Sequence, residues 1–331
     1  MCKKYLLTGA TGFLGRAVVG ELKRKDAEIH ALVMQNDPLA SGLPPGVHIH
    51  FGDVCNDQSV EGFFSDADPQ TCVIHIAGIV SVASKPSGQL YRVNVDGTRN
   101  ILTHCVRHHV GKLVYVSSVH AIPEKPMGTV ITEDALFSPE LVAGGYAKSK
   151  AMATALVFRA AKEGLNASVV FPSGIIGPGG SGMGTMTHML TSFLSGKLPF
   201  AVRGGYDFVD VRDVAAGIAA CAEFGSPGKG YILSGHYASV RDILEAANAA
   251  AGIKRRVRCL PLWLAETVAP LYEKWSIWKR QPLFFTPYAV AVLHSNGRFD
   301  RTAAAKALGY EPRALQTSVS DMVAWIRGGQ H

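Results

Sequence analysis

The first fifteen residues constrain the fold of this chain more than any other stretch. An apolar run at Tyr5–Leu7 is followed by glycines at positions 9, 12 and 15, and an apolar pattern of helical period starts at Phe13. A strand, a glycine-rich turn and a helix in this order form the first half of a βαβ unit. The glycine spacing is GxxGxxG rather than GxGxxG, so the turn alone is also compatible with any α/β protein.

The three glycines have distinct expected roles at such a turn. Gly9 permits the tight turn, Gly12 lets backbone N–H groups reach a pyrophosphate, and Gly15 lets the helix pack closely on the strand. The pyrophosphate would lie at the helix N-terminus, where unpaired N–H groups and the helix dipole favour an anion. The opening therefore predicts a dinucleotide-binding site.

The composition is that of a large folded chain. Its 331 residues are 47% hydrophobic and 18% charged, which allows a sizeable core in one domain or two. A net charge of +7 suits an anionic ligand, but the densest basic run, residues 254–258, is short. We interpret that run as a solvated strand edge rather than a nucleic-acid patch.

The cysteines and the apolar segments bear on compartment and on metals. The six cysteines are far apart and form no CxxC pair, which is typical of reduced thiols rather than of disulfides or a zinc site. The sequence has neither the apolar core of a signal peptide nor an uncharged apolar run long enough to span a membrane. We therefore expect a cytoplasmic protein with no metal site and no membrane span.

Strands and helices alternate through the first half of the chain. Strands are expected at residues 5–7, 27–33, 47–51, 72–77, 112–116 and 167–171, with helices at 13–19, 90–109 and 145–164. This regular alternation predicts an α/β fold with a doubly wound parallel sheet, a Rossmann fold. Ligands bind beyond the carboxyl ends of such strands, and these ends fall at Gly9, Asp53, Ala77, Ser117 and Pro172.

Two positions at these strand ends leave alternatives open. Asp53 is either a contact to adenine or an ordinary turn or helix-cap aspartate. The second strand ends near Val33 and Met34, where an acid would bind the ribose 2′-hydroxyl of NAD and an arginine the 2′-phosphate of NADP. Neither residue type stands there, since Asp37 comes late and Arg16 follows the third glycine. The choice between NAD and NADP is therefore open.

The second half changes character. Residues 172–184 are rich in glycine and proline, and shorter elements follow, with helices expected at 185–195, 211–223, 239–251 and 316–327 and extended segments at 206–210 and 230–233. We predict a dinucleotide-binding domain at 1–172, to which 204–235 returns. Residues 173–203 and 236–331 would form a smaller, mostly helical substrate-binding region. The aromatic-rich stretch 263–288 is either core and capping contacts, or a lid over a bulky apolar substrate, or a surface resting on lipid.

Tyr146 and Lys150 carry the predicted chemistry. They are four residues apart on the expected helix and therefore lie on one face. A phenol ionises near pH 10, and a neighbouring ammonium together with a positive nicotinamide ring would favour the phenolate. Tyr146 would then take a proton from an alcohol as hydride leaves, or return one to a carbonyl. The Ser118 hydroxyl would bind the same substrate oxygen, with Ser117 as its rival.

Several motifs stand in the order seen in one family. They are Thr8–Gly15, Gly52–Val54, His75–Gly78, Asn94–Thr98, Val116–Ser118, Tyr146–Lys150 and Pro172–Pro178. Over nearly its whole length the chain resembles the extended short-chain dehydrogenase/reductases, the NAD-dependent epimerase/dehydratase superfamily. Pro172–Gly179, Gly204–Ala215 and Lys306–Tyr310 look most like the branch of dihydroflavonol reductases and 3β-hydroxysteroid dehydrogenases.

The resemblance implies roles for individual residues. Tyr146 is the acid/base, Lys150 holds the nicotinamide ribose, and Ser118 orients the substrate. The implied cofactor contacts are Gly9, Thr11, Gly12, Phe13, Leu14, Gly15, Met34, Asp53, Val54, Ala77, Gly78, Asn94, Ser117, Tyr146, Lys150, Pro172 and Ser173. Many NADPH-dependent members have arginine at Met34 and many NAD-dependent members have an acid at Val33, so this chain departs from both patterns. His120 is either a substrate contact or an exposed loop histidine.

Three functions follow, in order of preference. The first is an NAD(P)-dependent oxidoreductase that interconverts a secondary alcohol and a ketone on a bulky, mainly apolar small molecule such as a steroid, terpenoid or flavonoid. The second is a sugar-nucleotide epimerase or dehydratase, against which Ser173 counts because such enzymes usually carry asparagine near that position. The third is a non-catalytic NAD(P)-sensing protein, against which the Tyr–Lys pair counts. The family also suggests a homodimer, and the scattered basic residues predict no nucleic-acid partner.

Overall fold

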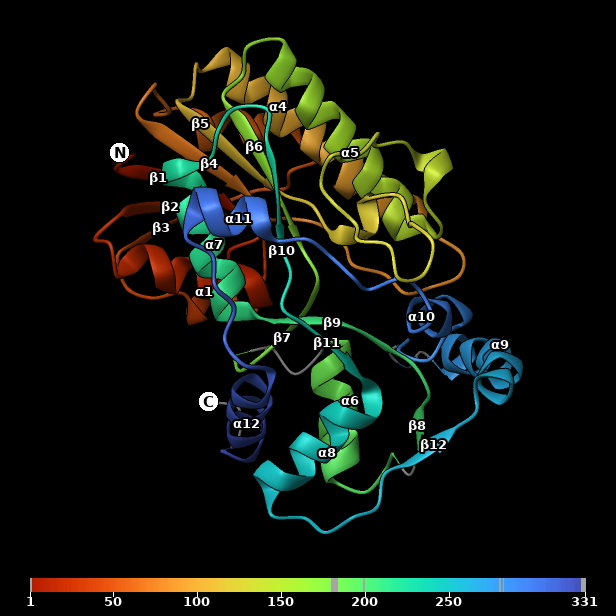
Figure 1. The fold of residues 1–331 in the computed structure, drawn as a ribbon. Helices are drawn as coiled ribbons and strands as arrows, with labels where there is room; N and C mark the ends of the chain where they lie inside the picture. The colour runs from red at the N-terminus through yellow and green to blue at the C-terminus, as the bar shows by residue number, and fades with distance from the viewer. Residues whose placement is uncertain (1, 180–183, 199, 280, 282, 329–331) are drawn as a thin grey trace.

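The computed structural model describes residues 2–179, 184–198, 200–279, 281 and 283–328. Its largest unit is a seven-stranded sheet in the order β10–β6–β5–β4–β1–β2–β3, with every neighbouring pair parallel (Figure 1). The strands are β1 (Lys4–Thr8), β2 (Glu28–Val33), β3 (Val47–Phe51), β4 (Thr71–His75), β5 (Lys112–Val116), β6 (Ala167–Pro172) and β10 (Gly230–Leu233). The predicted doubly wound Rossmann sheet is confirmed. Of the Gly- and Pro-rich stretch at 172–184, residues 180–183 lie outside the described residues.

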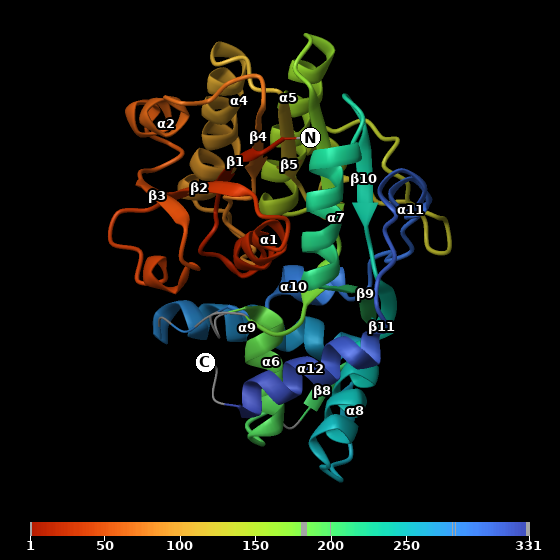
Figure 2. The ribbon, with the colours of Figure 1, turned by 90° about the vertical axis from the view of Figure 1, so that its left-hand side faces the viewer.

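Burial explains the sequence of the central strands. Every residue of β4, β5 and β6 is buried, because helices cover both faces of the sheet. One face carries α1 (Phe13–Lys23) and α7 (Val211–Phe224), which pack on each other, and the other carries α2 (Asp57–Phe64), α4 (Thr98–Arg107) and α5 (Gly145–Lys162) (Figure 2). The strand order reverses between β1 and β4. This switch point is where ligands of doubly wound sheets bind.

The segment predicted as one helix at 90–109 is three elements. A short helix α3 (Gly88–Tyr91) leads into a π-helix at Arg92–Gly97, and α4 follows. The expectation of one continuous helix was therefore wrong. Periodicity cannot reveal this insertion, because the apolar positions on both sides of it still face the sheet.

Except for α11 (Thr302–Leu308), which packs against α7 and β10, the remaining elements gather below the carboxyl ends of the strands in both views (Figures 1 and 2). Two small sheets contain β7 (Gly174–Ile176), β9 (Gly205–Asp210) and β11 (His236–Ser239), and β8 (Phe200–Val202) with β12 (Arg258–Leu260). The helices are α6 (Thr185–Leu194), α8 (Val240–Ala251), α9 (Leu262–Lys279), α10 (Pro287–Val292), α11 (Thr302–Leu308) and α12 (Leu315–Arg327). Of residues 204–235, α7 and β10 return to the large sheet, whereas β9 pairs with β7 and β11.

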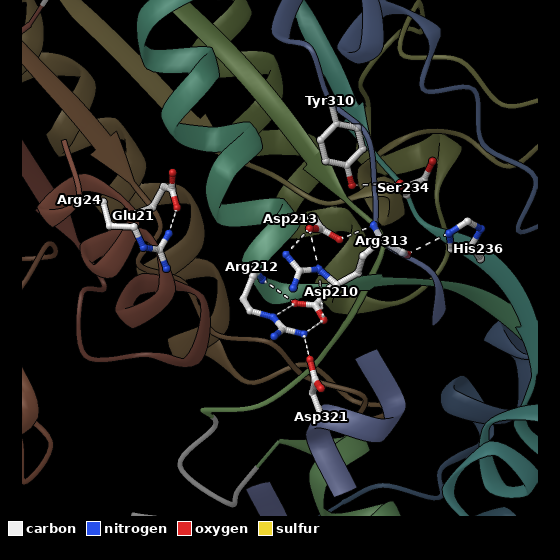
Figure 3. Close-up of polar contacts among 10 residues, drawn as sticks. All are labelled: Glu21, Arg24, Asp210, Arg212, Asp213, Ser234, His236, Tyr310, Arg313 and Asp321. Atoms are coloured by element: carbon white, nitrogen blue, oxygen red, sulfur yellow. Dashed lines mark hydrogen bonds and ion pairs between the residues drawn. The ribbon is translucent and has the colours of Figure 1, made fainter. Parts of the chain in front are cut away.

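A network of ion pairs joins α12 and the segment before it to the N-terminus of α7 (Figure 3). Asp210 caps α7 by accepting from the Arg212 N–H, and its carboxylate holds the Arg212 guanidinium at 2.8 and 2.7 Å. The same guanidinium reaches Asp321 of α12 at 2.7 Å. Arg313, just before α12, donates to Asp213 through its backbone N–H and its side chain, both at 2.8 Å. The last helix, α12, is thus fixed to α7.

Two further observations concern the cysteines and the length of the helices. The six cysteines are all free. Within the described residues, no helix combines the length and the apolar character that a membrane crossing requires.

Candidate active site

Neighbouring backbone packs tightly against the glycine-rich turn between β1 and α1. Gly9 has φ +74°, and a Cβ there would lie 2.7 Å from the Ala77 nitrogen. A Cβ at Gly15 would lie 2.0 Å from the Gly9 carbonyl oxygen. A Cβ at Gly12 would meet only that oxygen, at 3.3 Å. Gly9 and Gly15 are therefore required by packing, whereas Gly12 leaves space above the turn for a ligand.

We expect Gly15→Ala to destabilise the fold by more than about 3 kcal/mol, because the clash is with backbone that cannot move aside. Urea unfolding measures this change, and calorimetry with NAD(H) measures the accompanying loss of binding. Gly20→Ala is the matched control on the same helix, since a Cβ there meets nothing within 4 Å. That control should gain roughly 0.5–1 kcal/mol. Equal stability of the two variants would contradict this view of the turn.

A buried hydrogen-bond chain connects the turn to the π-helix. The Thr8 hydroxyl accepts from the Ala77 N–H and lies 2.7 Å from His75 Nδ1. His75 Nε2 lies 3.1 Å from the Thr98 hydroxyl, which donates to the Asn94 carbonyl at 2.7 Å. Each hydroxyl has one proton, so His75 is neutral with its proton on Nε2, and burial lowers its pKa to about 3. This series of hydrogen bonds fixes the position of Ala77, just after β4.

Asn94 explains the π-helix. Its side chain accepts from the Ile79 N–H at 2.7 Å and donates to the Ile79 carbonyl at 3.0 Å and to Ser149 Oγ at 2.9 Å. The widened turn brings this amide to a backbone segment outside the helix, a use of π-bulges that is frequent at functional sites. Ser149 in turn donates to the Tyr146 carbonyl. Asn94 therefore positions both the β4 loop and the helix that carries Tyr146.

The side chains of Tyr146 and Lys150 are buried on one face of α5. Lys150 Nζ donates to the Val116 carbonyl at 2.8 Å. A Cβ at Gly78 would lie 3.4 Å from the same nitrogen. Burial raises the pKa of Tyr146 to about 12, and hydrogen bonding with Ser118 opposes this rise. Burial lowers the pKa of Lys150 to about 8. Desolvation thus keeps the Tyr146 phenol neutral and makes the Lys150 ammonium easier to deprotonate, and an incoming charge would act strongly on both groups.

The two serines at the end of β5 point in different directions. Ser117 Oγ lies 2.7 Å from Thr154 Oγ1 of α5, in a buried pair. Ser118 Oγ accepts from the His120 N–H at 3.3 Å and interacts with the Tyr146 phenol. The geometry therefore places Ser118, rather than Ser117, beside the predicted acid/base.

An aromatic group surrounds Tyr146. The His120 ring stacks on Tyr206 of β9 at 5.4 Å and lies 6.0 Å from the Tyr146 ring and 6.3 Å from that of Tyr288. Burial lowers the pKa of His120 to about 4, so it is neutral. Of the two alternatives for His120, the exposed loop histidine was wrong, because β9 and α10 come from distant parts of the chain and pack against its ring. Sequence reasoning did not identify Tyr206 or Tyr288 as part of the site.

The aromatic-rich stretch divides into an inner and an outer face. Glu273 of α9 accepts from the Ser84 N–H and hydroxyl at 2.8 and 2.7 Å, and the Thr286 hydroxyl donates to the Val82 carbonyl. These contacts hold α9 and α10 against the loop after β4. The outer face of α9 exposes the rings of Trp263, Trp275 and Trp278.

One residue lies in an unexpected place in the segment after β2, where the adenosine part of the cofactor is expected to bind. Met34 follows β2 and is exposed. The chain then turns at Asn36, whose φ is +64°, and brings the Asp37 carboxylate to the Thr11 hydroxyl at 2.7 Å. Asp37 therefore lies against the glycine-rich turn despite coming late in the sequence. The turn residues Asn36 and Asp37 followed by Pro38 were the available signal.

Other predicted contacts lie around the same edge. Asp53 accepts a hydrogen bond from the Cys55 N–H at 2.9 Å. One of its carboxylate oxygens is therefore engaged in a turn, as the interpretation of Asp53 as a turn aspartate predicted. Val54 is buried against Gly97. Pro172 ends β6, and Ser173 after it is buried. Phe13 and Leu14 begin α1.

The profile of the NAD dependent epimerase/dehydratase family matches residues 5–234. The chain belongs to the NAD-dependent epimerase/dehydratase family. It is therefore an NAD(P)-dependent enzyme of CH–OH chemistry, as its residues predicted, with the choice between NAD and NADP unresolved.

Two curated proteins match this chain over nearly its full length. "Sterol demethylase protein B" of Methylococcus capsulatus is 27% identical over 97% of this chain and 98% of its own. A "putative dihydroflavonol 4-reductase" of Synechocystis is 29% identical over 99% of this chain and 95% of its own.

Among solved structures of this fold, that of gox2253 is 28% identical, with a TM-score of 0.83 over 98% of both chains. The UDP-glucose 4-epimerase of Thermus thermophilus in complex with NAD is 22% identical, with a TM-score of 0.77 over 98% of this chain and 99% of its own. This second likeness concerns the fold alone.

Proposed function

We propose that the chain interconverts a secondary alcohol and a ketone on a bulky, mainly apolar substrate such as a steroid, terpenoid or flavonoid. The observation that carries this proposal is the set of aromatic rings around Tyr146. His120, Tyr206 and Tyr288 offer flat surfaces and few charges, which suit a fused-ring substrate. Relatives named for sterols and hydroxysteroids support the same class.

The residues have the following proposed roles. A nicotinamide cofactor supplies or accepts the hydride when it is bound. Gly12 and the N-terminus of α1 bind its pyrophosphate, and Lys150 its ribose. Ser118 donates to the substrate oxygen, and Tyr146 moves the proton. Ala77 and Gly78, with Pro172 and Ser173, would border the cofactor where β4 and β6 end.

A screen of hydroxysteroids and their ketones against NAD(H) and NADP(H) tests this function. The expected result is a substrate-dependent change in nicotinamide absorbance. A sugar-nucleotide epimerase would instead keep its cofactor, so stoichiometric NAD released on denaturing the purified protein, with turnover of UDP-sugars only, would favour that alternative. Binding of neither cofactor would contradict both.

The Asp37 carboxylate beside Thr11 disfavours a 2′-phosphate, so we expect NAD(H) to bind more tightly than NADP(H). Met34→Arg should tighten NADP(H) binding about tenfold, because an exposed guanidinium at the end of β2 can pair with that phosphate. Calorimetry with both cofactors measures the change. Met127→Arg adds the same charge at another exposed methionine. An equal gain in that control would show that only net charge had acted.

We propose a homodimer, which the family suggests, and the cytoplasm, which the scattered cysteines suggest. Two copies would pack α4 and α5 into a four-helix bundle. Sedimentation at micromolar concentration should show a dimer, and a monomer would contradict this arrangement.

A further inference from the structure

The outer layer of the fold contains a group of ligating side chains that the proposed reaction does not use. His104 lies on α4, His108 caps the C-terminus of that helix one turn later, and Glu61 faces them from α2. One ring nitrogen of each histidine and a carboxylate oxygen of Glu61 all lie within 4.8 Å of one another. Helices α2 and α4 pack side by side over one face of the sheet (Figure 2).

The protons of His104 make this group unusual. Its side chain is fully buried, and Nε2 lies 2.9 Å from Asp57 Oδ1, so Nε2 carries a proton. In neutral His104, Nδ1 then presents a lone pair to Glu61 Oε2 at 3.1 Å. Within the described part of the chain, Nδ1 has no hydrogen-bond partner. A lone pair facing a carboxylate is repelled unless a proton or a cation lies between them.

His108 presents the same arrangement from the next turn. Its Nε2 is buried, lies 3.5 Å from Glu61 Oε1 and has no hydrogen-bond partner among the residues described. Protons alone would satisfy these nitrogens only if His104 carried a second proton between two carboxylates, while His108, whose ring centroid lies 6.0 Å away, pointed an Nε2 proton at the same Glu61. One divalent cation would satisfy both nitrogens and the carboxylate together.

We propose that His104, His108 and Glu61 bind one divalent transition-metal ion of the zinc type. Two imidazole nitrogens and one carboxylate oxygen are a donor set that Zn²⁺ prefers, with water in the fourth position. Asp57 fixes the His104 tautomer and ring as a carboxylate behind a ligating histidine does. Arg107 bonds Glu61 Oε2 at 2.7 Å, which leaves Oε1 as the ligand.

The bound ion would cross-link α2 to α4. Donor atoms in a tetrahedral zinc site are about 3.4 Å apart, so the side chains must close slightly around the ion. Glu61 and its partner Arg107 are both about half exposed, so the carboxylate can make this movement. The ion therefore acts on stability, and this proposal does not depend on the redox reaction.

Zinc titration of the full chain, without an affinity tag and stripped with a chelator, tests the proposal. Calorimetry should show one ion per wild-type chain, with affinity at least about tenfold lower in Glu61→Gln and in His108→Gln. Asp57→Asn should weaken binding about 10–100-fold. Zinc should raise the thermal midpoint of the wild type but not that of Glu61→Gln. His104→Ala is avoided because this side chain is fully buried.

A second histidine group provides the control. His30, His48 and His50 lie together on β2 and β3, with His30 Nδ1 2.9 Å from His50 Nε2. His50→Gln should leave the high-affinity ion in place. Loss of the ion in His50→Gln with retention in Glu61→Gln would overturn the proposal. Absence of binding of both Zn²⁺ and Co²⁺ to the wild type would overturn it too, and protonated histidines would then account for the contacts.

Discussion

Tyr146→Phe should lower kcat by about 10²- to 10⁴-fold, the usual contribution of a positioned acid or base. The variant keeps the ring that packs against His120 and loses only the phenolic oxygen. Binding of NAD(H), measured by calorimetry, should therefore not change. An effect on kcat without an effect on cofactor binding is the signature of an interaction made in the transition state.

Tyr237→Phe is the matched control, because this tyrosine on β11 is exposed. It should keep wild-type turnover. Thermal unfolding of both variants checks that neither has lost the fold. Full activity in Tyr146→Phe would remove the proton-transfer role from Tyr146 and with it the main support for the proposed reaction.

The parts of this site that the sequence predicted are those whose cause is local. Gly9 and Gly15 are required by contacts within one turn and the strand beside it. Tyr146 and Lys150 share a face because a helix repeats every 3.6 residues. Ser118 was predicted only as one of two candidates, since the direction of a side chain at a strand end depends on what packs behind it. Here Thr154 packs behind the strand end and pairs with the hydroxyl of Ser117.

The parts that the sequence did not predict depend on distant segments. Nothing near His120 indicates that Tyr206 and Tyr288 will enclose it, because β9 and α10 reach it only through the packing of the second half of the chain. The π-helix likewise depends on a contact between Asn94 and the backbone of Ile79 in the loop after β4. Asp37 was judged from its position in sequence, whereas the turn at Asn36 decides where its carboxylate lies.

The direction of the reaction should respond strongly to pH. Burial raises the pKa of Tyr146 to about 12 in the absence of cofactor, so nearly all of the enzyme carries the neutral phenol at pH 7. Alcohol oxidation needs the phenolate, and its rate should rise about tenfold per pH unit below the pKa in the cofactor complex. Ketone reduction needs the phenol and should stay level over the same range. Initial rates in both directions from pH 6 to 10 measure these profiles.

Lys150→Met should move the oxidation profile to higher pH. The positive nicotinamide and the Lys150 ammonium both favour the phenolate, and the variant removes one of these charges while keeping an unbranched side chain beside Val116. Burial lowers the pKa of Lys150 to about 8, so the ammonium acts mainly below that pH, where the loss of rate should be largest. Lys148→Met is the control, since Lys148 is exposed two residues away. If both variants gave the wild-type profile, the nicotinamide alone would set the ionisation of Tyr146, and Lys150 would serve only to bind ribose.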